Sequence, residues 1–162
     1  MSLGLVTVPE GRAAVIERGG RFRTVLGPGR HFVVPFADRV RARVDLGDQI
    51  LSAPPRAIEA GDGREVLIGF EVVFAVTDAR LATYEIGNPA FAIEQLTTTA
   101  LRQEASLTTG ERAVTAPGEL HRTVWTVLHD TTGRWGIAAK ELKLEVSPPA
   151  APGPPSTAQE WY

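Results

Sequence analysis

Residues 64–77 contain the pattern that most constrains the fold. Every second position from Val66 to Val76 is apolar, and each of these positions holds an aromatic or β-branched residue: Val66, Ile68, Phe70, Val72, Phe74 and Val76. A repeat of two residues places these side chains on one face of a strand, and these residue types favour strands. Because that face must be buried, the chain needs a sheet with a second layer packed against it.

Further strands are expected at residues 13–17, 31–35, 39–46 and 137–146. Gly19-Gly20 predicts a hairpin, and Gly27-Pro28-Gly29 predicts a tight turn. Residues 39–46 alternate strictly between apolar and polar side chains. We therefore expect one apolar face and one charged face, with these polar residues on the charged face: Arg39, Arg41, Arg43 and Asp45.

The second half of the chain changes to a helical period. Asn88-Pro89 is typical of a helix start, with asparagine as the cap and proline at the first position. Pro117 predicts the start of a second helix, which Gly133 is expected to end. The apolar stripe of this second helix consists of Leu120, Val124, Val127 and Leu128.

The order of strands, helices and a last strand predicts an α+β fold. We expect a mixed or antiparallel sheet of N-terminal strands plus a C-terminal strand, with two main helices. The length of 162 residues and 43% hydrophobic content suit one domain, which we place at residues 1–147. Residues 148–162 are rich in proline, and we expect them to form a disordered tail.

Catalytic and metal chemistry find no support in the sequence. The chain has no cysteine, which excludes disulfides and thiolate metal sites. His121 and His129 are too far apart on a helix to share a metal, and His31 lies alone in an apolar segment. A triad of Ser106, His121 and Asp130 lacks the nucleophile-elbow motif. We therefore predict no catalytic residue, no metal and no cofactor.

An opening strand at residues 8–20 is followed, at residues 27–40, by a GPG turn, an apolar strand and Pro-Phe-x-Asp, and Trp135-Gly136 precedes the last strand. In this order and spacing, these stretches resemble the SPFH or Band 7 family of stomatins and prohibitins, and residues 27–40 are similar to its most specific signature. The resemblance covers about residues 6–147, and its signature positions are Gly27, Pro28, Gly29, Pro35, Phe36, Asp38, Trp135 and Gly136.

This resemblance implies a non-catalytic scaffold that associates with membranes, self-associates and gathers membrane proteins such as proteases or channels. Two features differ from the family pattern. An N-terminal hydrophobic anchor is missing or reduced to residues 1–8, and a proline-rich tail replaces the C-terminal coiled coil. We therefore expect a cytoplasmic protein, peripheral at the inner face of the cell membrane, that forms weak homo-oligomers.

Charge is distributed unevenly along the chain. Residues 1–43 carry eight arginines against three acidic residues, a net charge of +5, whereas the remainder carries −7. The basic part suggests contact with anionic lipid, and the candidate residues for binding lipid or a partner are Arg21, Arg23, Arg30, Phe32, Phe36, Arg39, Arg41 and Arg43.

Three alternatives stay open. The arginines could form an ordinary solvated strand face, and the domain could be a soluble adaptor that makes no lipid contact. A small hydrolase is the third alternative. Nucleic acid is an unfavoured partner, because the whole chain is acidic, with a net charge of −2, and no stacking aromatic residues alternate with the arginines.

Overall fold

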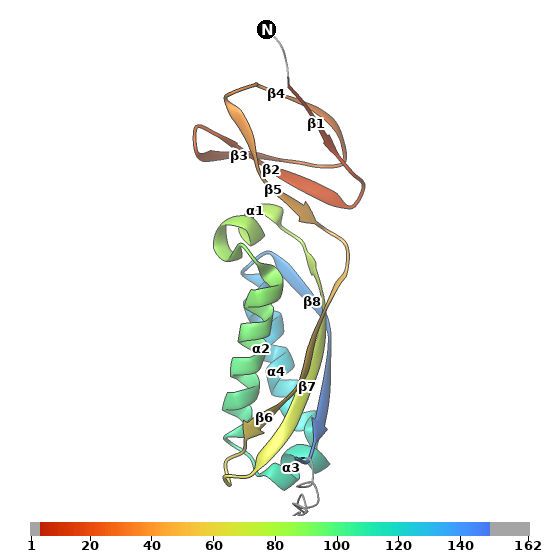
Figure 1. Cartoon of the computed structure of the whole chain (residues 1–162), viewed down its shortest axis with the longest axis vertical. Coiled ribbons are helices and arrows are strands. Elements are labelled where there is room, and N and C mark those ends of the chain that lie inside the picture. The colour runs from red at the N-terminus through yellow and green to blue at the C-terminus, as the bar shows by residue number, and fades with distance from the viewer. Residues whose placement is uncertain (1–3, 150–162) are drawn as a thin grey trace, which may run out of the picture.

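The computed structural model describes residues 4–149 and is elongated (Figure 1). The chain forms an α+β fold, as predicted, and its strands pair antiparallel in three sheets. The strands are β1 (Gly4–Val8), β2 (Arg12–Arg18), β3 (Arg21–Leu26), β4 (Gly29–Val33), β5 (Asp38–Asp45), β6 (Gln49–Glu59), β7 (Glu65–Val76) and β8 (Ile137–Ser147). The helices are α1 (Ala79–Leu81), the π-helical turn η1 (Ala82–Ile86), α2 (Pro89–Ala105), α3 (Gly110–Thr115) and α4 (Pro117–Gly133).

One end of the molecule is a three-stranded sheet in which β7 lies between β6 and β8. Helices α2 and α4 cover one face of this sheet (Figure 1). The predicted apolar face of β7 is confirmed, since Val66, Val72 and Phe74 are fully buried in the core. Residues 4–149 contain no helix that is both long and apolar enough to cross a membrane.

Both long helices begin as the sequence predicts. The Asn88 side chain accepts a hydrogen bond from the Phe91 amide at 3.2 Å, and α4 starts at Pro117. The stripe of α4 is buried at Leu120, Val124 and Leu128, whereas Val127 is partly exposed. The short elements α1, η1 and α3 have no strong sequence signal and were not expected. Of the expected proline-rich tail, only Pro148 and Pro149 fall within the described residues.

Strands β1 to β5 form the other end of the molecule (Figure 1). Strand β2 lies between β3 and β5, and both of its faces are buried. Ala14 and Ile16 pack toward the two-stranded β1–β4 ribbon, where they contact Val8. Ala13 and Val15 pack on the other side, against Ala79 of α1.

A β-bulge in strand β5 corrects one prediction. Val15 pairs with Ala42 and Ile16 pairs with Val40, so Arg41 is an extra residue that has no backbone pairing partner on β2. As a result, Val40 joins the cluster around Ile16, whereas Ala42 joins the cluster around Val15. The expectation of one apolar face and one arginine face on β5 is therefore wrong, because the bulge exchanges the two faces at Arg41.

Two further bulges lie in the sheet formed by β6, β7 and β8. Strand β6 continues through Pro54-Pro55, and its pairing with β7 shifts register between Ala53 and Arg56. Strand β8 pairs Ala139 with Phe74 and Glu141 with Val73, so the alternation of β8 changes phase between residues 139 and 141.

Candidate functional site

The outer face of the β1–β4 ribbon exposes large apolar side chains. Leu5 pairs with Phe32 across the ribbon, and Thr7 pairs with Arg30. Val6 and Val8 alternate with these residues and pack into the core, so Leu5 and Phe32 must point away from it. Their exposed fractions are 56% and 72%. Leu5 is not among the predicted binding residues, although it lies in the short apolar stretch at residues 1–8.

The turn that follows β4 exposes a second phenylalanine. Phe36 is fully exposed and has a φ of 66°. The turn is closed by two backbone hydrogen bonds to the Val34 carbonyl, from Ala37 at 3.3 Å and Asp38 at 2.9 Å. A bulky residue with positive φ is a strained exception, and strain of this kind concentrates at functional positions. We call the exposed apolar residues Leu5, Phe32, Val34 and Phe36 the apolar tip.

Asp38 holds this turn in place. Its side chain is only 1% exposed and accepts a hydrogen bond from the Val34 amide at 2.8 Å. Arg18 donates to both carboxylate oxygens, at 2.6 and 3.0 Å, and Arg23 donates to one at 2.7 Å. The Val34 amide, followed by Arg18, lowers the pKa of Asp38 below its ordinary value, against the opposing effect of burial.

Two arginines of β5, Arg39 and Arg41, approach the same buried carboxylate. Arg41 lies 3.2 Å and Arg39 lies 3.7 Å from the carboxylate of Glu17, which is 6% exposed. Tyr84 of η1 donates a hydrogen bond to the same carboxylate at 3.1 Å. Burial, followed by the adjacent Glu17, raises the pKa of Tyr84. Arg39 and Arg41 are therefore engaged in an ion-pair cluster that joins β2, β5 and η1.

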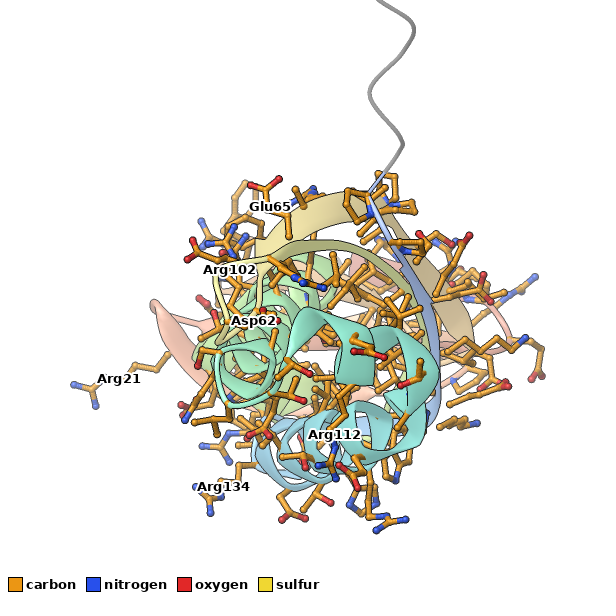
Figure 2. All side chains as sticks on the ribbon, turned by 90° about the horizontal axis from the view of Figure 1, so that it is seen from below. Arg21, Asp62, Glu65, Arg102, Arg112 and Arg134 are labelled. Carbon is orange, nitrogen blue, oxygen red and sulfur yellow. The ribbon has the colours of Figure 1, made fainter. Side chains whose placement is uncertain are left out.

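The remaining candidate arginines occupy different places. Arg43 donates to the Thr7 carbonyl of β1 at 3.3 Å. Arg21 lies at the exposed hairpin between β2 and β3, and its side chain projects from the side of the molecule (Figure 2). Arg30 is exposed on the ribbon, two residues before Phe32 on the same face. The structure thus gathers Arg30, Phe32 and Phe36 at the ribbon and its turn.

The signature glycines have local structural roles. Gly29 has a φ of 123° where β4 begins, and the ring nitrogen Nε2 of His31 lies 2.8 Å from the Gly27 carbonyl. Gly136 has a φ of 72°, and a Cβ at this position would lie 2.7 Å from the Asp78 carbonyl oxygen. Only glycine fits there. Its neighbour Trp135 packs against the main core.

The residues of the hydrolase alternative are occupied by structural contacts. Nε2 of His121 lies 2.7 Å from the Leu142 carbonyl, and the Ser106 hydroxyl donates to the Gln103 carbonyl at 2.6 Å. Asp130 lies beside His129 and not His121. Within residues 4–149, no group of three or more acidic or histidine side chains could hold a metal ion.

The family model described as SPFH domain / Band 7 family matches residues 6–151, and the chain therefore belongs to this family. It is 39% identical over 143 residues to an uncharacterized protein of Mycobacterium tuberculosis, covering 88% of this chain and 38% of that protein. It is also 26% identical over 138 residues to human stomatin-like protein 2, mitochondrial, covering 85% of this chain and 39% of that protein. The chain thus spans well under half the length of these relatives.

Proposed function

We propose that this domain is a non-catalytic scaffold that docks on a membrane surface through its apolar tip. The observation that supports the proposal is the exposure of Leu5, Phe32 and Phe36 on one ribbon and the turn beside it. Exposed apolar side chains in a cluster mark an interaction site. The strained backbone of Phe36 also supports the proposal, because the positive φ costs free energy of folding at a residue whose side chain is held in water.

The size of the tip suits reversible attachment. Full burial of one phenylalanine or leucine side chain contributes about 1.5–3 kcal/mol. Arg30 on the same face adds about 1 kcal/mol near an anionic surface. Partial insertion of Leu5, Phe32 and Phe36, together with the charge of Arg30, therefore supports peripheral binding that salt weakens. The proposed location is the cytoplasmic face of the cell membrane.

Membership of the SPFH family supports a role that goes beyond lipid contact. We propose that the domain self-associates weakly and brings membrane proteins, such as proteases or channels, to the surface on which it docks. The uneven charge along the chain, positive over residues 1–43 and negative over the remainder, favours contact between copies. Sedimentation at low and high salt tests this, and a monomer at every salt concentration would contradict it.

Vesicle co-sedimentation tests the docking surface. We expect the domain to bind vesicles of phosphatidylcholine with phosphatidylserine, and to bind phosphatidylcholine alone more weakly. A Phe32→Ser, Phe36→Ser variant should lose most of this binding. Phe91→Ser is the matched control, because Phe91 is 60% exposed on α2, away from the ribbon, and should not affect binding.

A soluble adaptor is the second candidate function. The ion pairs of Arg39 and Arg41 with Glu17 favour it, since these arginines are engaged within the domain. A folded wild-type protein that binds neither kind of vesicle would support the adaptor and exclude lipid docking.

A further inference from the structure

The 34–38 turn combines three unusual features. It places a bulky residue at positive φ, exposes that residue completely, and buries a carboxylate beside it. The positive φ disfavours the folded state at a bulky residue, and a buried carboxylate is tolerated only when it is paired. Their coincidence within three residues indicates that the conformation of this turn is maintained by specific contacts.

We propose that Asp38 is the positioning residue of the tip: its contacts with Val34, Arg18 and Arg23 hold the turn in the conformation that projects Phe36 outward. This inference rests on the proposed function, because it assigns the turn a role in membrane docking. It deepens that function by naming a buried residue that controls binding without touching the ligand.

The contacts of Asp38 explain how one side chain controls the turn. The carboxylate accepts from the Val34 amide, while the Val34 carbonyl accepts from the Ala37 and Asp38 amides. Val34 and Asp38 are thereby joined on both sides of Phe36. Arg18 and Arg23 come from β2 and β3, so they attach the turn to the sheet beneath it.

Electrostatics and positioning predict opposite effects when the Asp38 charge is removed. Asp38→Asn removes a negative charge and frees two arginines, and simple attraction to anionic lipid would then increase. Positioning predicts a decrease, because Phe36 is no longer held. We expect roughly three- to tenfold weaker binding to the mixed phosphatidylserine vesicles, the scale set by ordering one side chain.

Two further variants isolate the geometry from the charge. Arg18→Lys preserves the net charge but loses the two-pronged contact with Asp38, so it should also weaken binding. Asp45→Asn is the matched control. It removes the same charge from the other end of β5, where the Asp45 carboxylate accepts a hydrogen bond from the local Gly47 amide at 2.9 Å, and it should bind as well as the wild type or better.

A spectroscopic measurement on lipid-free protein tests the turn directly. The chain has no cysteine, so Phe36→Cys supplies a unique position for a nitroxide spin label. The label should show restricted motion in the Asp45→Asn background and faster motion in the Asp38→Asn and Arg18→Lys backgrounds. Circular dichroism verifies that each variant is folded.

The outcomes separate this inference from the proposed function. Unchanged label motion and unchanged or stronger vesicle binding in folded Asp38→Asn would overturn the positioning role, even if Phe32→Ser, Phe36→Ser abolishes binding. If the wild type binds no vesicle, the docking function fails, while faster label motion would still establish that Asp38 holds the turn.

Discussion

The hydroxyl of Tyr84 donates a hydrogen bond to the buried carboxylate of Glu17 across 3.1 Å, joining two residues 67 positions apart in the chain. This contact connects the π-helical turn η1 to the central strand of the N-terminal sheet. Arg39 and Arg41 approach the same carboxylate from β5. The cluster therefore links the end of the molecule that carries the tip to the segment that leads into α2.

Charge reversal of Arg41 should destabilise the fold. Arg41→Glu would place a second carboxylate beside buried Glu17, and we expect a loss of about 1–3 kcal/mol in the free energy of unfolding. Urea denaturation measures this. Arg30→Glu is the control, because Arg30 is exposed on the ribbon; it should change the free energy of unfolding by less than about 0.5 kcal/mol. Equal effects of the two variants would contradict the assignment of Arg41 to the Glu17 cluster.

Substitutions of Phe36 should reverse the usual preference for alanine over glycine. Glycine relieves a positive φ that costs an L-residue about 1–2 kcal/mol, whereas alanine retains this cost. We therefore expect Phe36→Gly to be more stable than Phe36→Ala by about 1 kcal/mol, measured by urea denaturation. Both variants should bind vesicles less well than the wild type. A more stable alanine variant would contradict the strained turn.

Acid should destabilise the wild type more than Asp38→Asn. The pKa of Asp38 is lowered in the folded state from the ordinary value of 3.8. The stabilisation linked to this group is therefore complete above about pH 4 and is lost as the pH falls through the lowered pKa. We expect the gap in stability between wild type and Asp38→Asn to narrow when urea midpoints are compared from pH 6 downward. A gap that stays constant to pH 2 would show that Asp38 is not the group involved.

Two glycines three residues apart should respond oppositely to alanine. Gly136→Ala introduces a Cβ 2.7 Å from the Asp78 carbonyl oxygen at a φ of 72°, and we expect a loss of more than about 2 kcal/mol. Gly133→Ala meets no atom within 4 Å at the end of α4 and should be neutral or stabilising by up to about 1 kcal/mol. Thermal unfolding of the two variants provides the comparison.

Local signals were sufficient to predict much of the fold. The alternation in β7, the Asn88 cap and Pro117 each act within a few residues, so the sequence alone indicates them. The bulge at Arg41 could not be predicted in this way, because it depends on how β5 pairs with β2, a strand that is buried on both faces. Alternation within β5 gives no information about which neighbour covers each face.

The candidate site was predictable to a similar extent. Phe32 and Phe36 are apolar residues beside a recognisable turn, and Arg30 is close to them in sequence. The roles of Arg39 and Arg41 depend on Glu17 and Tyr84, which are distant in the chain. An arginine at a polar strand position has the same local pattern whether it meets solvent or a buried carboxylate, so the ion pairs require the three-dimensional structure.

The elongated shape determines how a docked domain would stand. The ribbon and its turn lie at one end of the long axis, and α2, α4 and the β6–β8 sheet extend toward the other (Figure 1). A bilayer into which the tip inserts would therefore hold the long axis of the molecule close to the membrane normal. Most of its lateral surface would remain accessible above the headgroups, where neighbouring domains and the exposed portions of membrane proteins could meet it side by side.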